Sequence, residues 1–282
     1  MDAFTDRPFA GNPAAVVLDA DGFPDELFQS VATEMNLSET AFPHAAGLDG
    51  VRVLRWFTPT TEVSLCGHAT LAAAHALLEA GAAPPLRFLS RSGPLNVERD
   101  EDGRLRLDFP ADPPAEGPPP HGLLDALGVP EGTRVRFAAG TRCSLLELVE
   151  QDAAFLASLD PDMRALGRVD LPDGVMGVSV TTRLGLPAPL DFASRFFGPW
   201  VGVDEDPVTG MAHCLLGPWW AARLGREPDG AGLEALQGGV RQGRLRVEMR
   251  GARVHLVGQA VTVAEGVLRV GRGQGVRSAP PA

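Results

Sequence analysis

The sequence predicts a mixed α and β fold made of two similar halves. The chain has 282 residues and 44% apolar content, which is enough for a substantial core and for two domains or half-domains. Glycine (33 residues) and proline (25 residues) are both frequent, and they favour many tight turns between short elements over a helix bundle. The expected elements also follow the same order in both parts of the chain, which indicates an internal duplication.

Most of the expected elements are short strands. Apolar runs and alternating patterns, bounded by turn residues, are typical of such strands. In the first part of the chain they cover residues 2–5, 14–18, 40–42, 51–57, 62–65, 86–89, 95–99 and 104–109. In the second part they cover residues 134–138, 144–149, 177–182, 191–197, 244–250, 252–256, 260–264 and 267–270.

Two longer helices are expected at corresponding places in the two parts. The first follows the turn at residues 66–68 and covers about residues 70–81. The second follows the acidic loop at residues 204–210 and covers residues 211–224. The remaining expected helices are residues 24–35, 123–127, 153–159 and 162–166.

A proline-rich segment at residues 110–120 is the clearest linker in the chain. It divides a first half, residues 1–115, from a second half, residues 116–270. The last strands of the second half could pack back on the first half. Residues 271–282 are expected to form a flexible tail.

The composition excludes several classes of function. The formal net charge is −11, so a nucleic-acid partner is not expected, because binding phosphates requires clustered lysine or arginine. The chain has no lysine, which excludes a pyridoxal-phosphate Schiff base and a P-loop lysine within it. It also has no tyrosine that could serve as an acid.

We expect a cytoplasmic protein with no membrane partner. No uncharged apolar run reaches the roughly 18–20 residues that a membrane span requires. The N-terminus lacks the basic and then apolar pattern of a secretion signal. Cys66, Cys143 and Cys214 are far apart and odd in number, which favours a reducing compartment over a disulfide framework.

The start of the first long helix is a candidate anion site. Gly67 and His68 would lie at its open N-terminal end, where free backbone N–H groups and the helix dipole attract an anion. The helix behind Asp206 has the same place in the second half. If the two halves face each other, both helix starts converge on one cleft that can hold a carboxylate.

Proton chemistry beside that carboxylate needs an acid/base, and Glu39 is the candidate. It lies at an element boundary between Leu37 and Phe42, whose apolar side chains would partly withdraw it from water. The alternative role of Glu39 is that of a capping or solvated loop glutamate.

Three further side chains could take part. His68 could donate a proton or orient the substrate, and its alternative role is an imidazole bonded to a loop carbonyl. Asp206 could pair with His68 or bind a substrate amine or hydroxyl, and its alternative role is a helix cap. Cys66 could be a thiolate base, but a small buried side chain is favoured, because the second half has no matching cysteine.

No metal site is expected. His68 and His75 are seven residues apart in the sequence, without an accompanying His-x-x-x-His pair or carboxylate spacing. His75, His213 and Cys214 are expected to pack in the interior.

Five motifs occur in order along the chain. They are Asp2-Ala3-Phe4-Thr5-Asp6-Arg7-Pro8-Phe9-Ala10-Gly11-Asn12-Pro13, Asn36-Leu37-Ser38-Glu39-Thr40-Ala41-Phe42, Phe57-Thr58-Pro59, Cys66-Gly67-His68-Ala69-Thr70 and Glu205-Asp206-Pro207-Val208-Thr209-Gly210. Together they resemble the phenazine biosynthesis PhzF-like family. The resemblance covers residues 2–270, nearly the whole chain, and is specific for the family but not for one substrate.

The resemblance implies an α+β fold similar to that of diaminopimelate epimerase. In such a fold each of two pseudo-symmetric halves wraps a mostly antiparallel sheet, or open barrel, around a central helix. It also implies a site between the halves that needs no cofactor, a small anionic (carboxylate) substrate and a homodimer. The family's acid/base glutamate corresponds to Glu39, its glycine-flanked histidine to His68 and its acidic-loop aspartate to Asp206. The substrate-binding residues that it implies are Gly11, Asn12, Gly67, Ala69, Gly210 and Met211.

Two departures bear on the reaction. The family usually has serine where this chain has Met211, so a hydroxyl contact is lost while the backbone N–H remains. The epimerases have a second catalytic cysteine where this chain has Pro207, which disfavours a two-thiol racemase mechanism.

We therefore expect a cofactor-independent isomerase that moves a proton on a small carboxylate-bearing metabolite, with Glu39 as general acid/base. One alternative is an amino-acid-type epimerase or racemase that uses Glu39 with Cys66. Another alternative is a non-catalytic small-molecule-binding or interaction protein of the same fold. The methionine at position 211 is the feature that supports this alternative.

Overall fold

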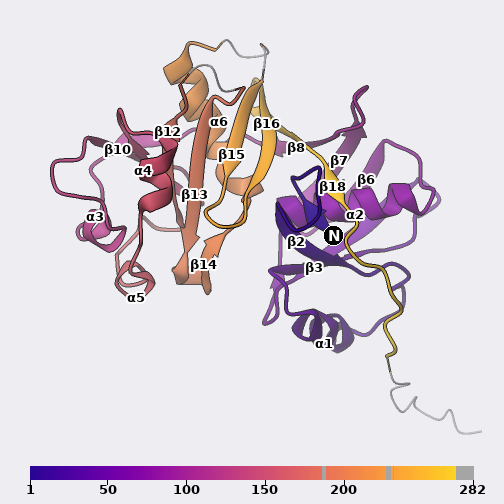
Figure 1. The fold of residues 1–282 in the computed structure, drawn as a ribbon. Coiled ribbons are helices and arrows are strands. Elements are labelled where there is room, and N and C mark those ends of the chain that lie inside the picture. Colours follow the sequence, from indigo (N-terminus) through magenta and orange to yellow (C-terminus); the bar gives the residue numbers. More distant parts are fainter. Residues whose placement is uncertain (186–188, 227–229, 231, 271–282) are drawn as a thin grey trace, which may run out of the picture.

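The protein consists of two lobes that lie side by side and share one continuous sheet (Figure 1). The computed structural model describes residues 1–185, 189–226, 230 and 232–270. The tail predicted at residues 271–282 lies outside the described residues. Among the helices of the described ranges, none combines the length and apolar character that a bilayer crossing needs.

The first lobe is a sheet that curls around one helix. Its helices are α1 (Asp25–Met35) and α2 (Gly67–Glu79). Its strands are β1 (Asp2–Ala3), β2 (Asn12–Val16), β3 (Glu39–Pro43), β4 (Val51–Phe57), β5 (Glu62–Val63), β6 (Leu86–Ser90), β7 (Gly93–Arg99) and β8 (Leu105–Pro110). They pair in the order β1-β2-β3-β4-β6-β7-β8, with β5 added on β4. α2 packs against β1, β2, β3 and β8 as the central helix of this lobe, while α1 packs on β3 and β4.

The second lobe has the same plan around α6 (Gly210–Leu224). Its shorter helices are α3 (Leu123–Ala126), α4 (Ala153–Ser158), α5 (Met163–Leu166) and the 3-10 turn η1 (Pro199–Val201). Its strands are β9 (Ala115–Gly117), β10 (Val135–Ala139), β11 (Ser144–Leu148), β12 (Val178–Arg183), β13 (Phe192–Gly198), β14 (Val203–Asp206), β15 (Leu233–Gln237), β16 (Gly243–Arg250) and β17 (Arg253–Gly258). They pair in the order β9-β10-β11-β12-β13-β15-β16-β17, with β14 added on β13.

The strand pairing repeats between the lobes. α2 connects the parallel strands β4 and β6, and α6 connects the parallel strands β13 and β15 in the same way. Each lobe has one further parallel pair, β2–β3 in the first and β11–β12 in the second. The other described pairs are antiparallel. The predicted α+β fold with two pseudo-symmetric halves is therefore confirmed.

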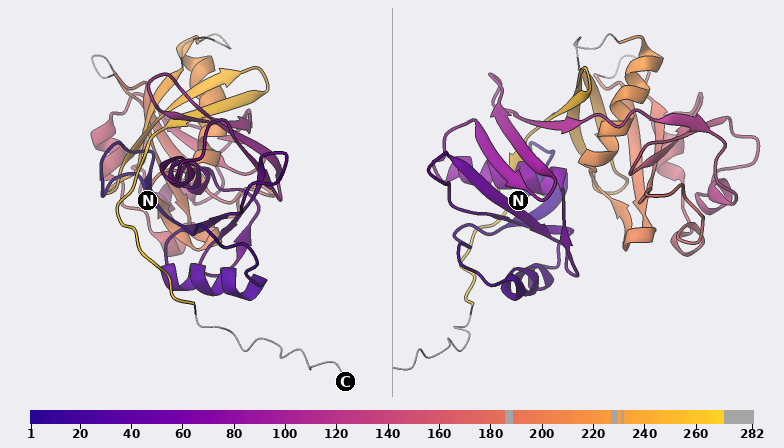
Figure 2. Two further views of the ribbon diagram at one scale, coloured as in Figure 1. Left: turned by 90° about the vertical axis from the view of Figure 1, so that its right-hand side faces the viewer. Right: turned by 180° about the vertical axis from the view of Figure 1, so that it is seen from behind.

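Backbone hydrogen bonds join the lobes in addition to the chain connection. β8 pairs antiparallel with β17, from Leu105 opposite Gly258 to Pro110 opposite Arg253. Directly after β17, β18 (Ala260–Val261) pairs with β1. Figure 2 shows this C-terminal segment running back along the first lobe. The last strands of the chain thus complete the sheet of the first lobe.

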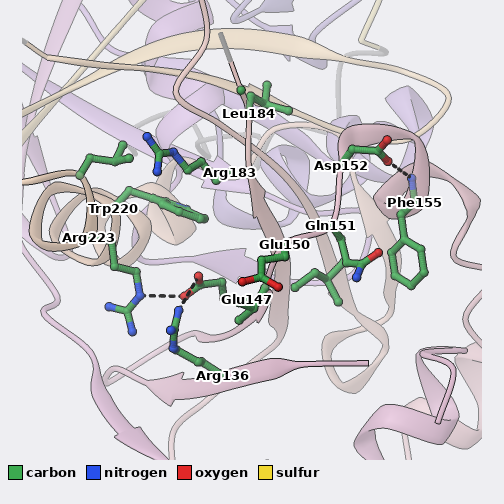
Figure 3. Close-up of a pocket in the computed structure, with 14 residues that line it drawn as sticks. Arg136, Glu147, Glu150, Gln151, Asp152, Phe155, Arg183, Leu184, Trp220 and Arg223 are labelled. Atoms are coloured by element: carbon green, nitrogen blue, oxygen red, sulfur yellow. Dashed lines mark hydrogen bonds and ion pairs between the residues drawn. The ribbon is translucent and has the colours of Figure 1, made fainter. Parts of the chain in front are cut away.

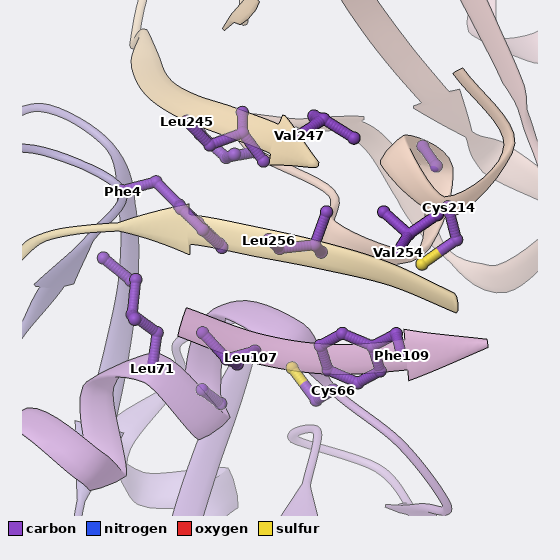
Figure 4. Close-up of a cluster of buried hydrophobic side chains, with 14 of the residues drawn as sticks. Phe4, Cys66, Leu71, Leu107, Phe109, Cys214, Leu245, Val247, Val254 and Leu256 are labelled. Carbon is purple, nitrogen blue, oxygen red and sulfur yellow. The ribbon is translucent and has the colours of Figure 1, made fainter. Parts of the chain in front are cut away.

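One apolar core runs through the joint between the lobes (Figure 4). The cross-strand pairs Leu107–Leu256 and Phe109–Val254 lie at the joint, and all four side chains are buried. α2 packs on β8 from one side and α6 packs on β17 from the other. Both helices are buried on nearly all sides, which fits their apolar and small residues. This packing fixes the position of the two helix starts.

Several predictions about the elements were wrong. The first long helix begins at Gly67 and not near Thr70, because Cys66 is already its extended N-cap. The predicted linker is not wholly irregular, since residues 115–117 lack proline and pair as β9 with β10. Residues 267–270 form no strand and are exposed to solvent. The strands β14 and β15 were missed, because one is acidic and the other has no β-branched residue.

Candidate active site

The two long helices begin against each other. Gly67 of α2 and Gly210 of α6 lie so close that a Cβ atom added to either would be 3.2 Å from the other's Cα atom. In the described structure, neither N-cap residue, Cys66 or Thr209, caps its helix with a side-chain hydrogen bond. The first-turn N–H groups of both helices therefore open side by side, and both dipoles attract an anion to one place.

Glu39 and His68 meet at this junction. Glu39 opens β3, where it lies opposite Ala14 of β2, and its side chain is 18% exposed. Its Oε2 atom lies 3.1 Å from Nε2 of His68, an ion-pair distance. Both atoms are buried, and within the described part of the chain neither has a hydrogen bond of good geometry. The predicted acid/base and the predicted histidine thus form one charged pair.

Asn12 links the two lobes at the site. Its side chain is fully buried, and Nδ2 lies 2.7 Å from Oδ1 of Asp206 and 3.0 Å from the carbonyl oxygen of Val208. A third contact, 3.1 Å long, reaches Nδ1 of His68. Because an amide has only two N–H groups, the two shorter contacts account for both. Nδ1 of His68 also lies 3.6 Å from Sγ of Cys66, which is its other polar neighbour.

A second set of hydrogen bonds fixes the loop that carries Asp206. The hydroxyl of Thr209 donates to Oδ2 of Asp206 at 2.5 Å. Gln237, fully buried at the end of β15, accepts a hydrogen bond from the N–H of Thr209 at 2.9 Å. Its Nε2 donates to the carbonyl oxygen of Asp206 at 2.8 Å and to Oγ1 of Thr209 at 3.0 Å. Every polar atom of the Gln237 amide is therefore used to hold this loop.

Burial and neighbouring charges shift the pKa values at the site. Burial raises the pKa of Asp206 and the nearby Glu39 raises it further, against the opposing effect of His68. Burial opposes a charge on His68, but Cys66 and Glu39 beside the ring outweigh it, so the pKa of His68 is raised well above its usual value. Burial, together with Glu39, also raises the pKa of the Cys66 thiol. These shifts favour the protonated form of each of the three groups relative to the same group in water, and the charges that raise the pKa of His68 are those of a Cys66 thiolate and of Glu39.

The other predicted substrate-binding residues lie around the same junction. Gly11 has a φ of 65°, and a side chain there would collide with the carbonyl oxygen of Ala3. Ala69 is buried in the first turn of α2. Met211 lies in the first turn of α6, with its sulfur 3.9 Å from Nη1 of Arg142. The predicted residues therefore gather at the two helix starts, and their contact with a substrate stays a prediction.

Three neighbours of the site were given no role of their own from the sequence. Gln237 belongs to a strand that was not predicted, and nothing in its local sequence indicates a role. Arg142 lies in a turn between β10 and β11, far from the motifs. Thr209 directly precedes α6, so its place as an N-cap was the one signal that could have identified it.

Glu39, Cys66 and His68 also bring three types of metal-ligating side chain together. Each offers one ligand atom, and these atoms lie within 4.8 Å of one another. The prediction of no metal site rested on the spacing of histidines along the chain. Such spacing cannot detect a glutamate that a separate strand brings close in space. Of the residues expected in the interior, His213 and Cys214 are buried, whereas His75 is half-buried and pairs with Glu79 at 3.2 Å.

A pocket of about 1080 Å³ lies elsewhere, in the second lobe (Figure 3). Its charged lining includes Glu147, which accepts hydrogen bonds from Arg136 at 2.9 Å and from Arg223 at 2.7 Å. These charges are therefore paired within the protein. Of the described residues that line this pocket, none belongs to the predicted site. The polar cluster at the helix starts, and not this pocket, carries the candidate chemistry.

Known proteins resemble this chain along nearly its whole length. A family model described as phenazine biosynthesis-like protein (PhzC-PhzF) matches residues 1–266. An uncharacterized isomerase of Pseudomonas aeruginosa is 48% identical over 96% of this chain and 97% of its own. The crystal structure of a phenazine biosynthesis PhzF-family protein from Enterococcus faecalis superposes with a TM-score of 0.84 at 39% identity, covering 95% of this chain and 97% of its own. A probable proline racemase from Agrobacterium radiobacter shares the fold, with a TM-score of 0.55 at 13% identity, over 88% of this chain and 83% of its own.

Proposed function

Because the chain belongs to the phenazine biosynthesis-like (PhzC-PhzF) family, we propose that it is an isomerase that moves a proton on a small carboxylate-bearing metabolite. The observation that carries this proposal is the pairing of Glu39 with His68 at two joined helix starts. Relatives that bear the name isomerase match the chain over nearly their whole length, which supports the reaction class but not a substrate.

In the proposed reaction the substrate carboxylate binds the first-turn N–H groups of α2 and α6. Glu39, as a carboxylate, takes a proton from a carbon next to that carboxylate or to an enol system. The electron pair of the broken C–H bond moves into the conjugated system, and the helix N-termini stabilise the resulting negative charge. Glu39 then returns the proton to another carbon, so the product is an isomer and the step consumes no oxidant or co-reactant.

His68 and Asp206 have supporting roles in this reaction. Nε2 of His68 lies 3.1 Å from Oε2 of Glu39 and can orient the base that the first step requires. Asp206, whose pKa is raised, is held by Asn12 and Thr209 in one orientation. In its protonated form it can donate a hydrogen bond to a substrate hydroxyl or amine.

The test is proton exchange in D₂O. A panel of small metabolite carboxylates is incubated with the protein, and incorporated deuterium is read by mass spectrometry. We expect Glu39→Gln to lower the exchange rate on the identified substrate by about 10²–10⁴-fold, the usual contribution of a general acid/base. Glu101→Gln, in the exposed turn between β7 and β8, is the matched control and should exchange at the wild-type rate. If Glu39→Gln exchanges deuterium at the wild-type rate, Glu39 is not the base.

One observation favours an epimerase as the second candidate. Cys66 lies 3.6 Å from His68 and could serve as a second acid/base beside Glu39. The raised pKa of its thiol opposes this role, because the thiolate is the reactive form. Cys66→Ser distinguishes the two reactions, since inversion of configuration that persists without the sulfur excludes a thiol mechanism. If metabolites raise the melting temperature but none exchanges deuterium, the chain is a non-catalytic binding protein.

A further inference from the structure

The geometry of the site points to a second ligand besides the substrate. We propose that Glu39, Cys66 and His68 form a site for Zn²⁺ and that the bound ion blocks the enzyme. The metal site stands on the contacts of these three residues alone. Only the inhibition rests on the function proposed above.

Two atoms of this group face each other without hydrogen-bond partners among the described residues. They are Oε2 of Glu39 and Nε2 of His68, both buried and 3.1 Å apart. Zinc holds nitrogen and oxygen ligands at about 2.0–2.2 Å, so two such ligands on a tetrahedral ion lie roughly 3.3 Å apart. The pair is therefore already spaced for two zinc ligands. A zinc ion bound to both atoms would lie beside the line that joins them and would take the place of the proton in this ion pair.

The other nitrogen of the His68 ring is free to support this arrangement. When Nε2 binds a metal, a neutral imidazole carries its proton on Nδ1. The amide of Asn12 does not need this nitrogen as an acceptor, because the oxygens of Asp206 and Val208 take both of its N–H groups. The contacts of Nδ1 with Nδ2 of Asn12 and with Sγ of Cys66 hold the ring in one orientation, as zinc-bound histidines usually are held.

Cys66 supplies the third ligand. Its Sγ is buried, and the ligand atoms of the three residues all lie within 4.8 Å of one another. Sulfur binds zinc at about 2.3 Å, which places it roughly 3.5 Å from a second ligand atom. Sγ lies 3.6 Å from Nδ1 of His68, which is the other ring nitrogen, so the sulfur must turn toward Nε2 by rotation about the Cα–Cβ bond of Cys66 before it can bind the same ion. On binding, the ion replaces the thiol proton of Cys66 and the proton on Nε2 of His68, and both are released to solvent.

The donor set selects zinc over the common hard cations. Thiolate and imidazole are ligands of zinc and of its spectroscopic substitute Co²⁺, whereas Mg²⁺ and Ca²⁺ prefer oxygen ligands throughout. Three protein ligands leave a fourth position for water, which is typical of solvent-accessible zinc sites. The side chain of Glu39 is 18% exposed, so the site has contact with solvent. A zinc ion on Oε2 would occupy the atom that must accept the substrate proton.

The first test is metal binding by the full chain after removal of any affinity tag. Co²⁺ is titrated in, and the thiolate-to-cobalt charge-transfer band is followed in the near ultraviolet, while zinc affinity is measured by calorimetry. We expect one equivalent of metal with a thiolate band in the wild type. Cys66→Ser should lose the band and bind zinc at least tenfold more weakly. Cys214→Ser and Cys143→Ser are matched controls, because both thiols are buried outside the group, and both should keep the band.

The outcomes of this test are decisive. A thiolate band that persists in Cys66→Ser, or zinc binding that is equal in the wild type and in that variant, overturns the site. Absence of any band in the wild type does the same. If Cys66→Ser fails to fold, Cys66→Ala provides the same comparison, and His68→Asn provides an independent one with a Co²⁺ affinity at least tenfold weaker.

The second test is inhibition of the deuterium exchange found for the identified substrate. Zinc should abolish exchange by the wild type, a chelator should restore it, and Mg²⁺ at the same concentration should have no effect. If zinc produces the expected binding signature and exchange continues at the same rate, the blocking role is wrong while the metal site stands. If no substrate exchanges, the proposed function fails, and the cobalt spectrum still decides whether the site exists.

Discussion

Gly67 of α2 and Gly210 of α6 touch backbone to backbone, and this contact brings the two helix N-termini together. A side chain on either residue would have to push the other helix away, because a Cβ atom would lie 3.2 Å from the facing Cα atom. The contact thus suits the proposed anion site, which an acidic protein with no lysine has to build without a lysine side chain. Peptide N–H groups and dipoles from two helices replace the charged side chain.

Gly67→Ala tests this contact. Alanine would normally stabilise a helix by roughly 0.5–1 kcal/mol relative to glycine, so a loss of stability would show that the helix contact outweighs propensity. We expect the free energy of unfolding to fall by about 1–3 kcal/mol, as for other overpacked interiors, and exchange activity to fall with it. Denaturant unfolding measures the change. Gly117→Ala in β9 is the control, because a Cβ atom there meets no atom within 4 Å.

Asn12→Leu tests the link between the lobes. Leucine has a similar size but no donors, so Asp206 and the carbonyl oxygen of Val208 would lose their partner in a buried place. We expect unfolding to become easier by about 1–3 kcal/mol, the usual cost of an unsatisfied buried group. Asn96→Leu on the exposed face of β7 should stay within about 0.5 kcal/mol of the wild type. Equal effects of the two substitutions would contradict the assigned role.

Gln237→Glu tests whether the loop that carries Asp206 must be held. The substitution keeps the size of the side chain but removes the two N–H donors to Asp206 and Thr209. Because Gln237 is fully buried and holds the loop that carries the proposed Asp206, we expect kcat to fall at least tenfold while KM changes little. Gln242→Glu is the control, since its amide makes a single long contact of 3.4 Å with the residues that the structure describes. A change in KM alone would indicate that the loop binds substrate without taking part in the chemical step.

Acid stability tests the burial of His213. Burial lowers the pKa of His213 to about 4, below its usual value near 6.5, so the unfolded chain takes up a proton before the folded one does. The stability contributed by neutral His213 is present above pH 6.5 and is lost as the pH falls from 6.5 toward 4, by about 3 kcal/mol in full.

The matched comparison for this prediction is His213→Phe, which packs beside Phe192 without a titratable group. Its unfolding free energy should decline less than that of the wild type between pH 7 and pH 4. His68 and Asp206 act in the opposite direction, because raised pKa values in the folded state give stability that is present at low pH and lost as the pH rises. Both proteins share these two groups, so the difference between them reports His213. Parallel pH profiles would show that folding does not lower the pKa of His213.

The sequence predicted the fold, and it predicted which residues would come together at the two helix starts, because the informative residues are local. Gly67 and Asp206 lie at the ends of secondary-structure elements, where the local sequence already indicates a helix start. This indication does not depend on how distant parts of the chain pack. The role of Gln237 could not be predicted, because this residue acts through three hydrogen bonds to a loop that is distant in sequence. The same is true of the approach of Glu39 to Cys66, which depends on how β3 packs beside α2.

The pairing of β17 with β8 and of β18 with β1 has a consequence for synthesis of the chain. The first lobe contains the N-terminus, yet its sheet lacks both flanking strands until the ribosome has passed residue 261. Unpaired edges of β1 and β8 therefore stay available to other chains through most of translation, when aggregation is a hazard. The lobe that is made first is completed last, and a fragment that ends at residue 115 should not fold alone.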